Sequence, residues 1–197
     1  MASSSPTYRA VRRFAHAVLR TVYRLDVDGA ERVPAAGPLL VVANHESVLD
    51  PFVLGTAVPR QLRFLAKAEL WRYAPVARAM DVLGAIPVER ERGDVAALAA
   101  ARVALEAGAA VAIFPQGRVR STGPWLRGAA RLALTTGAPL LPVRLLGTAD
   151  ALSRGRVGLP RLRVVVGTPI TVERAPTTVA TARELMARVQ SAVGELG

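Results

Sequence analysis

Cysteine is absent from this chain of 197 residues, and only two histidines occur in it. The absence of thiols excludes a cysteine nucleophile and leaves no obvious ligand cluster for a metal ion, so we expect neither metal catalysis nor a bound cofactor. No apolar run approaches the ~20 residues of a membrane-spanning helix, and the N-terminus lacks the apolar core of a signal peptide. These absences predict a cytoplasmic protein.

Acidic residues are also scarce, since 15 of them stand against 26 basic residues and the net charge is +11. No acid occurs between Glu106 and Asp150, although that window holds five arginines, at positions 118, 120, 127, 131 and 144. We expect the window to attract anions. Aromatic residues make up only 5% of the chain and no nucleic-acid motif is recognisable. An anionic lipid or a phosphorylated small molecule therefore fits better than nucleic acid.

Short apolar runs alternate with segments of helical spacing along most of the chain. Strand candidates lie at 39–43, 62–66, 85–88, 109–114, 140–145 and 162–166. Helix candidates lie at 50–58, 69–80, 94–107, 125–136 and 178–193. Such alternation is typical of an α/β domain with a central, mostly parallel or mixed sheet flanked by helices. The length fits a single domain of this class, over residues 26–197.

Residues 1–25 are expected to precede that domain as an amphipathic helix. Its apolar side would carry Tyr8, Val11, Phe14, Ala15, Val18 and Val22, and its basic side Arg9, Arg13, His16, Arg20 and Arg24. A helix of this kind suits a membrane interface, so we expect peripheral association with the cytoplasmic face of the membrane. The alternative is a helix that packs on the domain and shows its arginines to water.

The stretch from Asn44 to Asp50 sets a histidine and a carboxylate together directly after a strand candidate. Neutral imidazole commonly takes a proton from an alcohol near neutral pH, and a nearby carboxylate fixes its tautomer and stabilises the imidazolium. Asp50 followed by Pro51 predicts the N-cap and first turn of a helix. His45 would then lie in the turn before that helix and meet Asp50. The stretch indicates acyl transfer, with a capping or packing histidine as the alternative.

Three other residues follow strand candidates in the same way, namely Lys67, Arg90 and Gly117. In open α/β sheets, ligand sites gather outside the carboxyl ends of the strands. We therefore expect these residues to converge with His45 at one edge of the sheet, although they are far apart in the sequence.

Four segments in this order, within residues 37–145, resemble the glycerophospholipid acyltransferase family, whose best-known members are the 1-acylglycerol-3-phosphate acyltransferases. The first block of that family, Asn-His-x-x-x-x-Asp, is matched by Asn44, His45 and Asp50. The resemblance implies that His45 is the general base and Asp50 its orienting partner. It also implies that Asn44 contributes to substrate binding.

The second block of the family ends in arginine and is matched by Gly84 to Arg90. The resemblance implies that Arg90 grips the phosphate of the acceptor, since guanidinium can meet phosphate oxygens with two parallel hydrogen bonds. Lys67 lies in the similar stretch between the two blocks, where it would support the oxyanion or the phosphate. The alternatives are a solvated arginine in a charged turn and a surface lysine after a strand.

The third block is imperfect, because Phe-Pro-Glu-Gly-Thr-Arg-Ser of the family is Phe-Pro-Gln-Gly-Arg-Val-Arg here, over 114–120. Gln116 keeps the size of the glutamate without its charge. Val119 occupies the arginine position of the family, and Arg120 lies beside it. The resemblance implies substrate binding by Gln116, Gly117, Arg118 and Arg120. A basic surface turn after a buried strand is the alternative. The stretch 125–143 resembles the approach to the fourth block, which we expect to shape an acyl pocket.

The implied reaction moves a fatty acyl group from acyl-CoA or acyl carrier protein to the free hydroxyl of 1-acylglycerol 3-phosphate, giving phosphatidic acid. The chain contains no Cys and no Gly-x-Ser-x-Gly elbow, so direct transfer is simpler than an acyl-enzyme route. Backbone amides or Lys67 would stabilise the oxyanion. The departures in the third block leave open an acyltransferase of the same fold for another lysolipid acceptor, or a membrane-binding relative without turnover.

Overall fold

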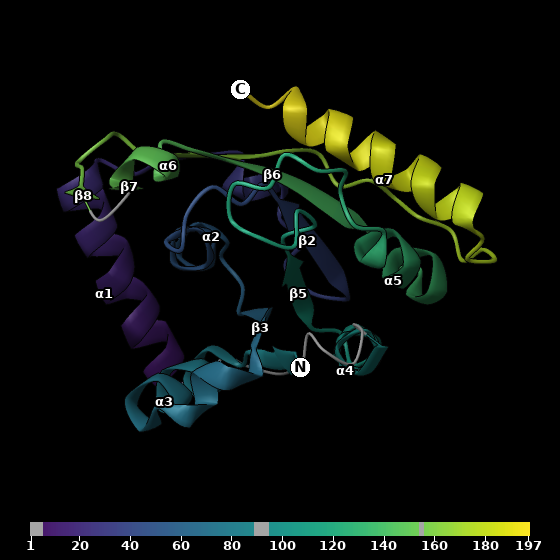
Figure 1. Ribbon diagram of the computed structural model, residues 1–197, viewed down its shortest axis with the longest axis horizontal. Helices are drawn as coiled ribbons and strands as arrows, with labels where there is room; N and C mark the ends of the chain where they lie inside the picture. The colour runs from purple at the N-terminus through teal and green to yellow at the C-terminus, as the bar shows by residue number, and fades with distance from the viewer. Residues whose placement is uncertain (1–5, 89–94, 154–155) are drawn as a thin grey trace.

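The computed structural model describes residues 6–88, 95–153 and 156–197. Its centre is a seven-stranded sheet in the order β1-β9-β6-β2-β5-β3-β4 (Figure 1). These strands are β1 (Asp26–Asp28), β2 (Leu39–Ala43), β3 (Leu62–Lys67), β4 (Ile86–Val88), β5 (Ala110–Ile113), β6 (Leu140–Leu146) and β9 (Arg163–Val166). The five strands from β6 to β4 run parallel, whereas β9 is antiparallel to β6. The expected α/β domain with a mixed sheet is confirmed.

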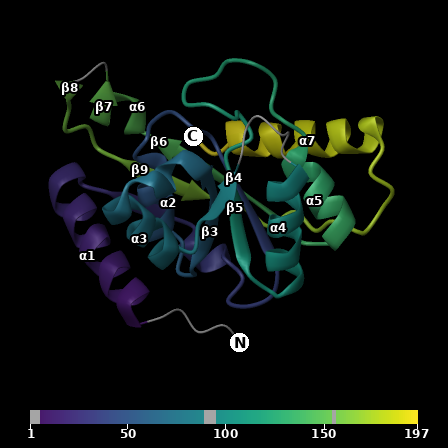
Figure 2. The same cartoon turned by 60° about the horizontal axis from the view of Figure 1, so that its bottom comes forward.

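Seven α-helices and two 3-10 helices surround the sheet within the described residues. The α-helices are α1 (Pro6–Tyr23), α2 (Asp50–Ala57), α3 (Ala74–Leu83), α4 (Val95–Glu106), α5 (Gly128–Thr136), α6 (Thr148–Ala151) and α7 (Val179–Gly194). The 3-10 helices are η1 (Ala30–Arg32) and η2 (Ala68–Arg72). Outside the main sheet, β7 (Leu152–Ser153) pairs antiparallel with β8 (Arg156–Val157). In Figures 1 and 2, α1, α2 and α3 lie on one side of the sheet, and α4, α5 and α7 lie on the other.

Strand β2 shows why the core has two halves. All five of its residues are buried, as expected for a central parallel strand covered on both faces. Leu39 and Val41 belong to the core that includes Leu54 of α2, whereas Leu40 and Val42 belong to the core that includes α4, α5 and α7. Because successive side chains point to opposite faces, one apolar run supplies both halves of the core.

Two differences from the expected elements have local causes. The expected helix over 69–80 is divided into η2 and α3, because Pro75 in the first turn of α3 restricts the residue before it and cannot donate a backbone hydrogen bond. Strand β1 was not expected, since it is only three residues long and two of them are acidic. Both acids form ion pairs with arginines in or just before β9. Asp28 lies 2.5 Å from Arg163, and Asp26 lies 3.3 Å from Arg161.

The expected N-terminal helix is present as α1, and it packs on the domain by a side that includes Tyr8 of the expected apolar side, whereas Val11, Phe14, Val18 and Val22 stay exposed. Tyr8 and Leu19 are buried, and Arg12 Nη2 donates to the carbonyl oxygen of Thr56 on α2 at 3.2 Å. Burial raises the pKa of the Tyr8 phenol. None of the helices in the described ranges is long and apolar enough to cross a membrane.

Candidate active site

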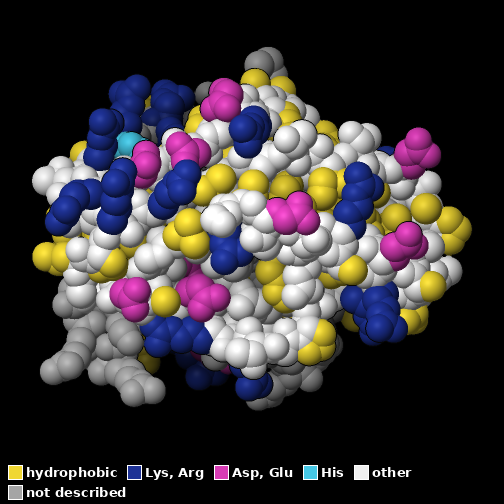
Figure 3. Space-filling view, turned by 90° about the horizontal axis from the view of Figure 1, so that it is seen from above, with side chains coloured by type: hydrophobic (Ala, Val, Ile, Leu, Met, Phe, Trp, Pro, Cys, Tyr) yellow, Lys and Arg dark blue, Asp and Glu magenta, His cyan; other side chains and the backbone are white. Residues whose placement is uncertain are grey.

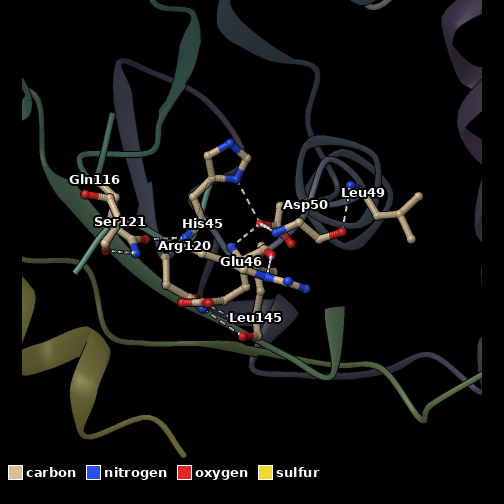
Figure 4. Close-up of polar contacts among 10 residues, drawn as sticks. His45, Glu46, Leu49, Asp50, Gln116, Arg120, Ser121 and Leu145 are labelled. Carbon is tan, nitrogen blue, oxygen red and sulfur yellow. Dashed lines mark hydrogen bonds and ion pairs between the residues drawn. The ribbon is translucent and has the colours of Figure 1, made fainter. Parts of the chain in front are cut away.

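The site lies where β2 and β5 end side by side. Val42 is in register with Ile113, so the turn that follows β2 meets the loop that follows β5. The first carries His45 and the second carries Gln116 (Figure 4). Parallel strands therefore bring together residues about seventy positions apart in the chain, as the alternation of elements predicts.

His45 and Asp50 are hydrogen-bonded. The distance between His45 Nδ1 and Asp50 Oδ2 is 2.8 Å. The Asp50 side chain is fully buried, whereas that of His45 is 16% exposed. The other ring nitrogen, Nε2, points away from Asp50 (Figure 4). One imidazole nitrogen is thus fixed by a carboxylate, and the other remains available for a reacting group.

The Asp50 carboxylate is turned back toward the turn before α2. Besides the His45 ring, its Oδ2 accepts the backbone N–H groups of Glu46 at 2.6 Å and Ser47 at 2.8 Å. The prediction that Asp50 is the N-cap of α2 was wrong: Leu49 holds that position, and Asp50 is the first helical residue. Asp50 Oδ2 is occupied by these donors from the turn, which hold the carboxylate beside His45.

An aromatic ring is stacked against one face of the His45 imidazole. The rings of His45 and Phe114 are stacked with their centroids 4.3 Å apart and their planes 20° apart, and Phe64 lies next, 6.3 Å from Phe114. Sequence reasoning did not assign a role to Phe114, although its place at the start of the third block was a signal. The stack limits the orientations of the ring, because Asp50 and Phe114 constrain it from different directions.

An apolar cavity of about 170 Å³ opens beside His45. Its wall includes Leu65 of β3, Leu98 of α4, and Ile113, Phe114 and Leu126. A larger, open groove of about 730 Å³ lies along α7 with Arg188 and Glu195, and it contains none of the expected site residues. We assign the site to the smaller cavity, because it combines an apolar interior with a hydrogen-bonded histidine.

Gln116 and Arg120 were expected to bind substrate, but their side chains hold the two loops together. Gln116 Oε1 accepts the backbone N–H of His45, and Gln116 Nε2 donates to the carbonyl oxygen of Ser121 at 3.0 Å. The Arg120 guanidinium donates through Nε to the carbonyl oxygen of Glu46 at 3.1 Å and through Nη2 to that of Ala149. These contacts give both side chains a structural role in the backbone around His45, and their expected part in substrate binding stays a prediction.

Asn44 also makes contacts different from those expected. Its Nδ2 donates to the carbonyl oxygen of Leu145 at 2.9 Å, and its Oδ1 accepts the N–H of Leu145 at 2.7 Å. The amide thus pairs with the backbone of β6 as a further residue of β2 would. This double contact gives Asn44 a structural role, and its expected part in substrate binding stays a prediction.

The remaining expected residues differ in what can be said of them. Gly117 has a φ of +70°, and a Cβ there would lie 2.9 Å from Leu126 Cδ1, so glycine is required at this turn. Arg118 is exposed, and its side chain makes no hydrogen bond or ion pair with any residue that the structure describes. The backbone of Lys67 ends β3, but its side chain is not described. Arg90 lies outside the described residues.

No group of three or more His, Cys, Asp or Glu side chains could hold a metal ion within residues 6–88, 95–153 and 156–197. The described site therefore consists of the hydrogen-bonded pair His45 and Asp50, an aromatic support, an apolar cavity and exposed Arg118 nearby in the chain. Such an arrangement can take a proton from a hydroxyl and hold an apolar group beside it.

Curated relatives are similar in sequence to most of this chain. It is 30% identical over 181 residues to the chloroplastic 1-acyl-sn-glycerol-3-phosphate acyltransferase BAT2 of Brassica napus, covering 87% of this chain and 52% of that protein. It is 28% identical over 142 residues to the 1-acyl-sn-glycerol-3-phosphate acyltransferase of Bacillus subtilis, covering 71% and 70% respectively. The chain thus spans about half the length of the Brassica protein.

A solved structure shares the fold. The crystal structure of the 1-acyl-sn-glycerophosphate acyltransferase PlsC from Thermotoga maritima matches all of this chain and 83% of its own with a TM-score of 0.75, at 24% sequence identity. The family described as Acyltransferase matches residues 24–146, which hold the turn after β2, the loop after β5 and most of the sheet. From this match over more than half of its length, the chain belongs to the acyltransferase family.

Proposed function

We propose that this protein transfers a fatty acyl group from acyl-CoA or acyl carrier protein to the free hydroxyl of 1-acylglycerol 3-phosphate, giving phosphatidic acid. The observation that carries the proposal is the hydrogen-bonded pair His45 and Asp50 beside an apolar cavity. Membership of the acyltransferase family and the names of the relatives add support for the reaction class.

His45 acts as the general base in this proposal. Its Nε2 takes the proton from the acceptor hydroxyl, and the hydroxyl oxygen attacks the carbonyl carbon of the thioester. The tetrahedral intermediate then collapses, the C–S bond breaks, and the imidazolium returns its proton to the leaving thiolate. The new ester and a free thiol are the products, and no acyl-enzyme forms.

Asp50 orients the base and stabilises it when it is charged. Its buried carboxylate accepts a hydrogen bond from the Nδ1–H group, so Nε2 carries the lone pair that the reaction needs. The N–H groups of Glu46 and Ser47 hold the carboxylate in place without neutralising it. The imidazolium that forms during transfer therefore faces a fixed negative charge.

The acyl group occupies the apolar cavity beside His45. Leu65, Leu98 and Leu126 supply apolar side chains to its wall, which suits a hydrocarbon chain. Its carbonyl would lie at the mouth, within reach of His45. Backbone amides of the loops or Lys67 would stabilise the oxyanion, and Arg118 and Arg90 would bind the acceptor phosphate.

The segment of residues 1–25, which contains α1, associates with the membrane interface ahead of the acyltransferase domain of residues 26–197. Val11, Phe14, Val18 and Val22 of α1 are 40–74% exposed, so its apolar stripe is not used in packing on the domain. Lys and Arg side chains gather on the side of the molecule where α1 lies (Figure 3). An exposed apolar stripe beside basic residues favours binding to anionic lipid, on the cytoplasmic face of the membrane.

Vesicle binding tests the membrane proposal. Phe14→Asp should reduce sedimentation with vesicles that contain anionic phospholipid, because it places a charge in the apolar stripe. Val103→Asp is the matched control, since Val103 is a similarly exposed apolar residue on α4. Deletion of residues 1–24 should reduce vesicle binding more than it reduces activity on detergent-soluble substrates. Equal binding by the deletion variant and the full chain would refute a membrane role for α1.

Acceptor-dependent thiol release tests the reaction. The purified protein is mixed with a long-chain acyl-CoA, or with acyl carrier protein carrying the same acyl group, with and without 1-acylglycerol 3-phosphate. Release that requires the acceptor and yields phosphatidic acid supports the proposal. No release from either donor with any lysolipid would favour a membrane-binding relative without turnover.

A different lysolipid acceptor is the second candidate, favoured by the loop after β5. Val119 stands where the family has arginine, and the Arg120 guanidinium is bonded to the carbonyl oxygens of Glu46 and Ala149. Arg118 is then the exposed arginine of this loop that is free of such contacts among the described residues. Competition between 1-acylglycerol 3-phosphate and lysophospholipids with larger head groups would separate the two candidates by their kcat/KM ratios.

A further inference from the structure

The peptide groups on both sides of the His45 Cα are held by the loop after β5. The His45 N–H donates to Gln116 Oε1, and the His45 carbonyl oxygen accepts the backbone N–H of Arg120 at 2.8 Å. The amide nitrogen of Gln116 then donates to the carbonyl oxygen of Ser121, the residue after Arg120 (Figure 4). These three hydrogen bonds form a closed ring that joins the two loops.

The side chain at position 116 must accept one hydrogen bond and donate another in this ring. An amide does both, because it carries a carbonyl oxygen and an NH₂ group. The glutamate of the family pattern at this position would still accept the His45 N–H. Ionised, it would turn a second acceptor toward the carbonyl oxygen of Ser121 and replace a hydrogen bond with a repulsion.

Arg120 shapes the other half of the ring. Its φ of +57°, uncommon for a residue with a side chain, belongs to the conformation in which its N–H meets the His45 carbonyl oxygen. Its guanidinium then spans from Glu46 to Ala149, which joins α6 to the same turn. The loop of this chain is therefore built around an arginine where the family pattern has serine.

We propose that Gln116 is a positioning residue for His45, matched to this loop, and that a glutamate at this position lowers turnover. The inference rests on the proposed function, in which His45 Nε2 must reach the acceptor hydroxyl. A displacement of a reacting group by about 1 Å can cost on the order of 10²-fold in rate. The ring fixes the backbone that carries the imidazole, while Asp50 and Phe114 fix the imidazole itself.

Steady-state kinetics of Gln116→Glu and Gln116→Met test the proposal. Gln116→Glu should lower kcat by roughly tenfold or more with little change in the KM of donor or acceptor, because in this proposal the side chain acts through the backbone of His45 and Ser121, to which it is bonded. Gln116→Met, which has a similar size but neither donor nor acceptor, should lower kcat further. Gln190→Glu, an exposed position on α7, controls for the added charge and should behave as wild type.

Hydrogen exchange at the His45 amide separates the ring from the chemistry. The amide should exchange slowly in the wild type and in Gln116→Glu, which keeps the acceptor, and faster in Gln116→Met. Equal exchange in the wild type and Gln116→Met would overturn the ring. This measurement holds even if the wild type releases no thiol, which would overturn the proposed function alone.

Turnover by Gln116→Glu equal to or above the wild type would overturn the positioning role. If Gln116→Glu does not fold, as judged by circular dichroism, Gln116→Met decides. A folded Gln116→Met with reduced kcat and unchanged KM values supports the role, and one with wild-type kcat refutes it.

Discussion

The turn after β2 and the loop after β5 meet at one edge of the sheet but are organised differently. In the turn, Asp50 contacts His45, Glu46 and Ser47, all within five positions of itself. In the loop, Gln116 and Arg120 reach residues 71 and 74 positions away in the turn. The turn thus forms its own reactive pair, whereas the loop supplies the frame that holds the turn.

This difference separates chemistry from placement. A change in the turn should remove a step of the reaction, whereas a change in the loop should alter how well the site is assembled or which acceptor it holds. Four substitutions test that separation, and their expected effects decrease from the first to the last.

Replacing His45 removes the proposed base. His45→Ala should lower acceptor-dependent thiol release by on the order of 10³-fold while the circular dichroism spectrum stays unchanged. His16→Ala, which changes the only other histidine of the chain, is the matched control. A near-normal rate in His45→Ala would contradict the base mechanism and with it the reactive role of the turn.

Replacing Asp50 by asparagine keeps the shape and removes the charge. The amide oxygen can still accept the N–H groups of Glu46 and Ser47, so the turn should fold. Turnover should fall by on the order of 10²-fold, because the imidazolium loses its carboxylate partner. The control is Asp81→Asn, which changes a carboxylate bonded to Trp71 far from the site in the chain. Similar rates for both variants would show that charge in the turn is unimportant.

Gly117→Ala tests the frame through stability. The added Cβ combines a φ of +70° with a contact of 2.9 Å to Leu126 Cδ1, so we expect a loss of about 1–3 kcal/mol in the free energy of unfolding. Gly37→Ala is matched, since its φ is +84° and no atom lies within 4 Å of the added Cβ. Denaturant unfolding of both variants isolates the contact. Equal losses of unfolding free energy in the two variants would mean that Leu126 moves aside at no cost in stability.

Arg118→Ala should affect only the acceptor. Its side chain is exposed and is bonded to none of the described residues, so folding and kcat should change little. The acceptor KM should rise several-fold, on the order of 1 kcal/mol, because a charge-assisted contact to phosphate is lost. Arg131→Ala is the control for a general loss of positive charge, since Arg131 is an exposed arginine of the same basic window, on α5. An unchanged acceptor KM in Arg118→Ala would remove the loop from acceptor binding.

Local patterns carried much of the fold and the reactive pair. The apolar run over 39–43 matches β2 residue for residue, and the spacing of His45 and Asp50 across a strand-to-helix turn placed them together. Both depend on neighbours in the sequence. The wrong N-cap prediction for α2 also came from a local pattern. Asp-Pro is typical of a cap, but the Asp50 carboxylate binds the His45 ring and the backbone N–H groups of Glu46 and Ser47 instead.

Contacts between distant segments were beyond the sequence patterns. Asn44 meets Leu145, which lies 101 positions away, so no local spacing could reveal that its amide pairs with β6. The side of α1 that packs on the domain was also hidden, because Tyr8 and Leu19 are buried while Val11, Phe14, Val18 and Val22 stay exposed. Topology decides such partners, and a single sequence carries little trace of them.

The Asn44 amide also sets the direction in which the chain leaves the sheet. Its two hydrogen bonds to the Leu145 backbone extend the pairing of β2 with β6 by one residue. They thereby fix which face of the sheet each following side chain points to. Side chains alternate between the faces of a strand, so insertion of one residue between Ala43 and Asn44 would send His45 toward the opposite face. The seven-residue motif would survive intact in such a chain and yet meet neither Phe114 nor the cavity.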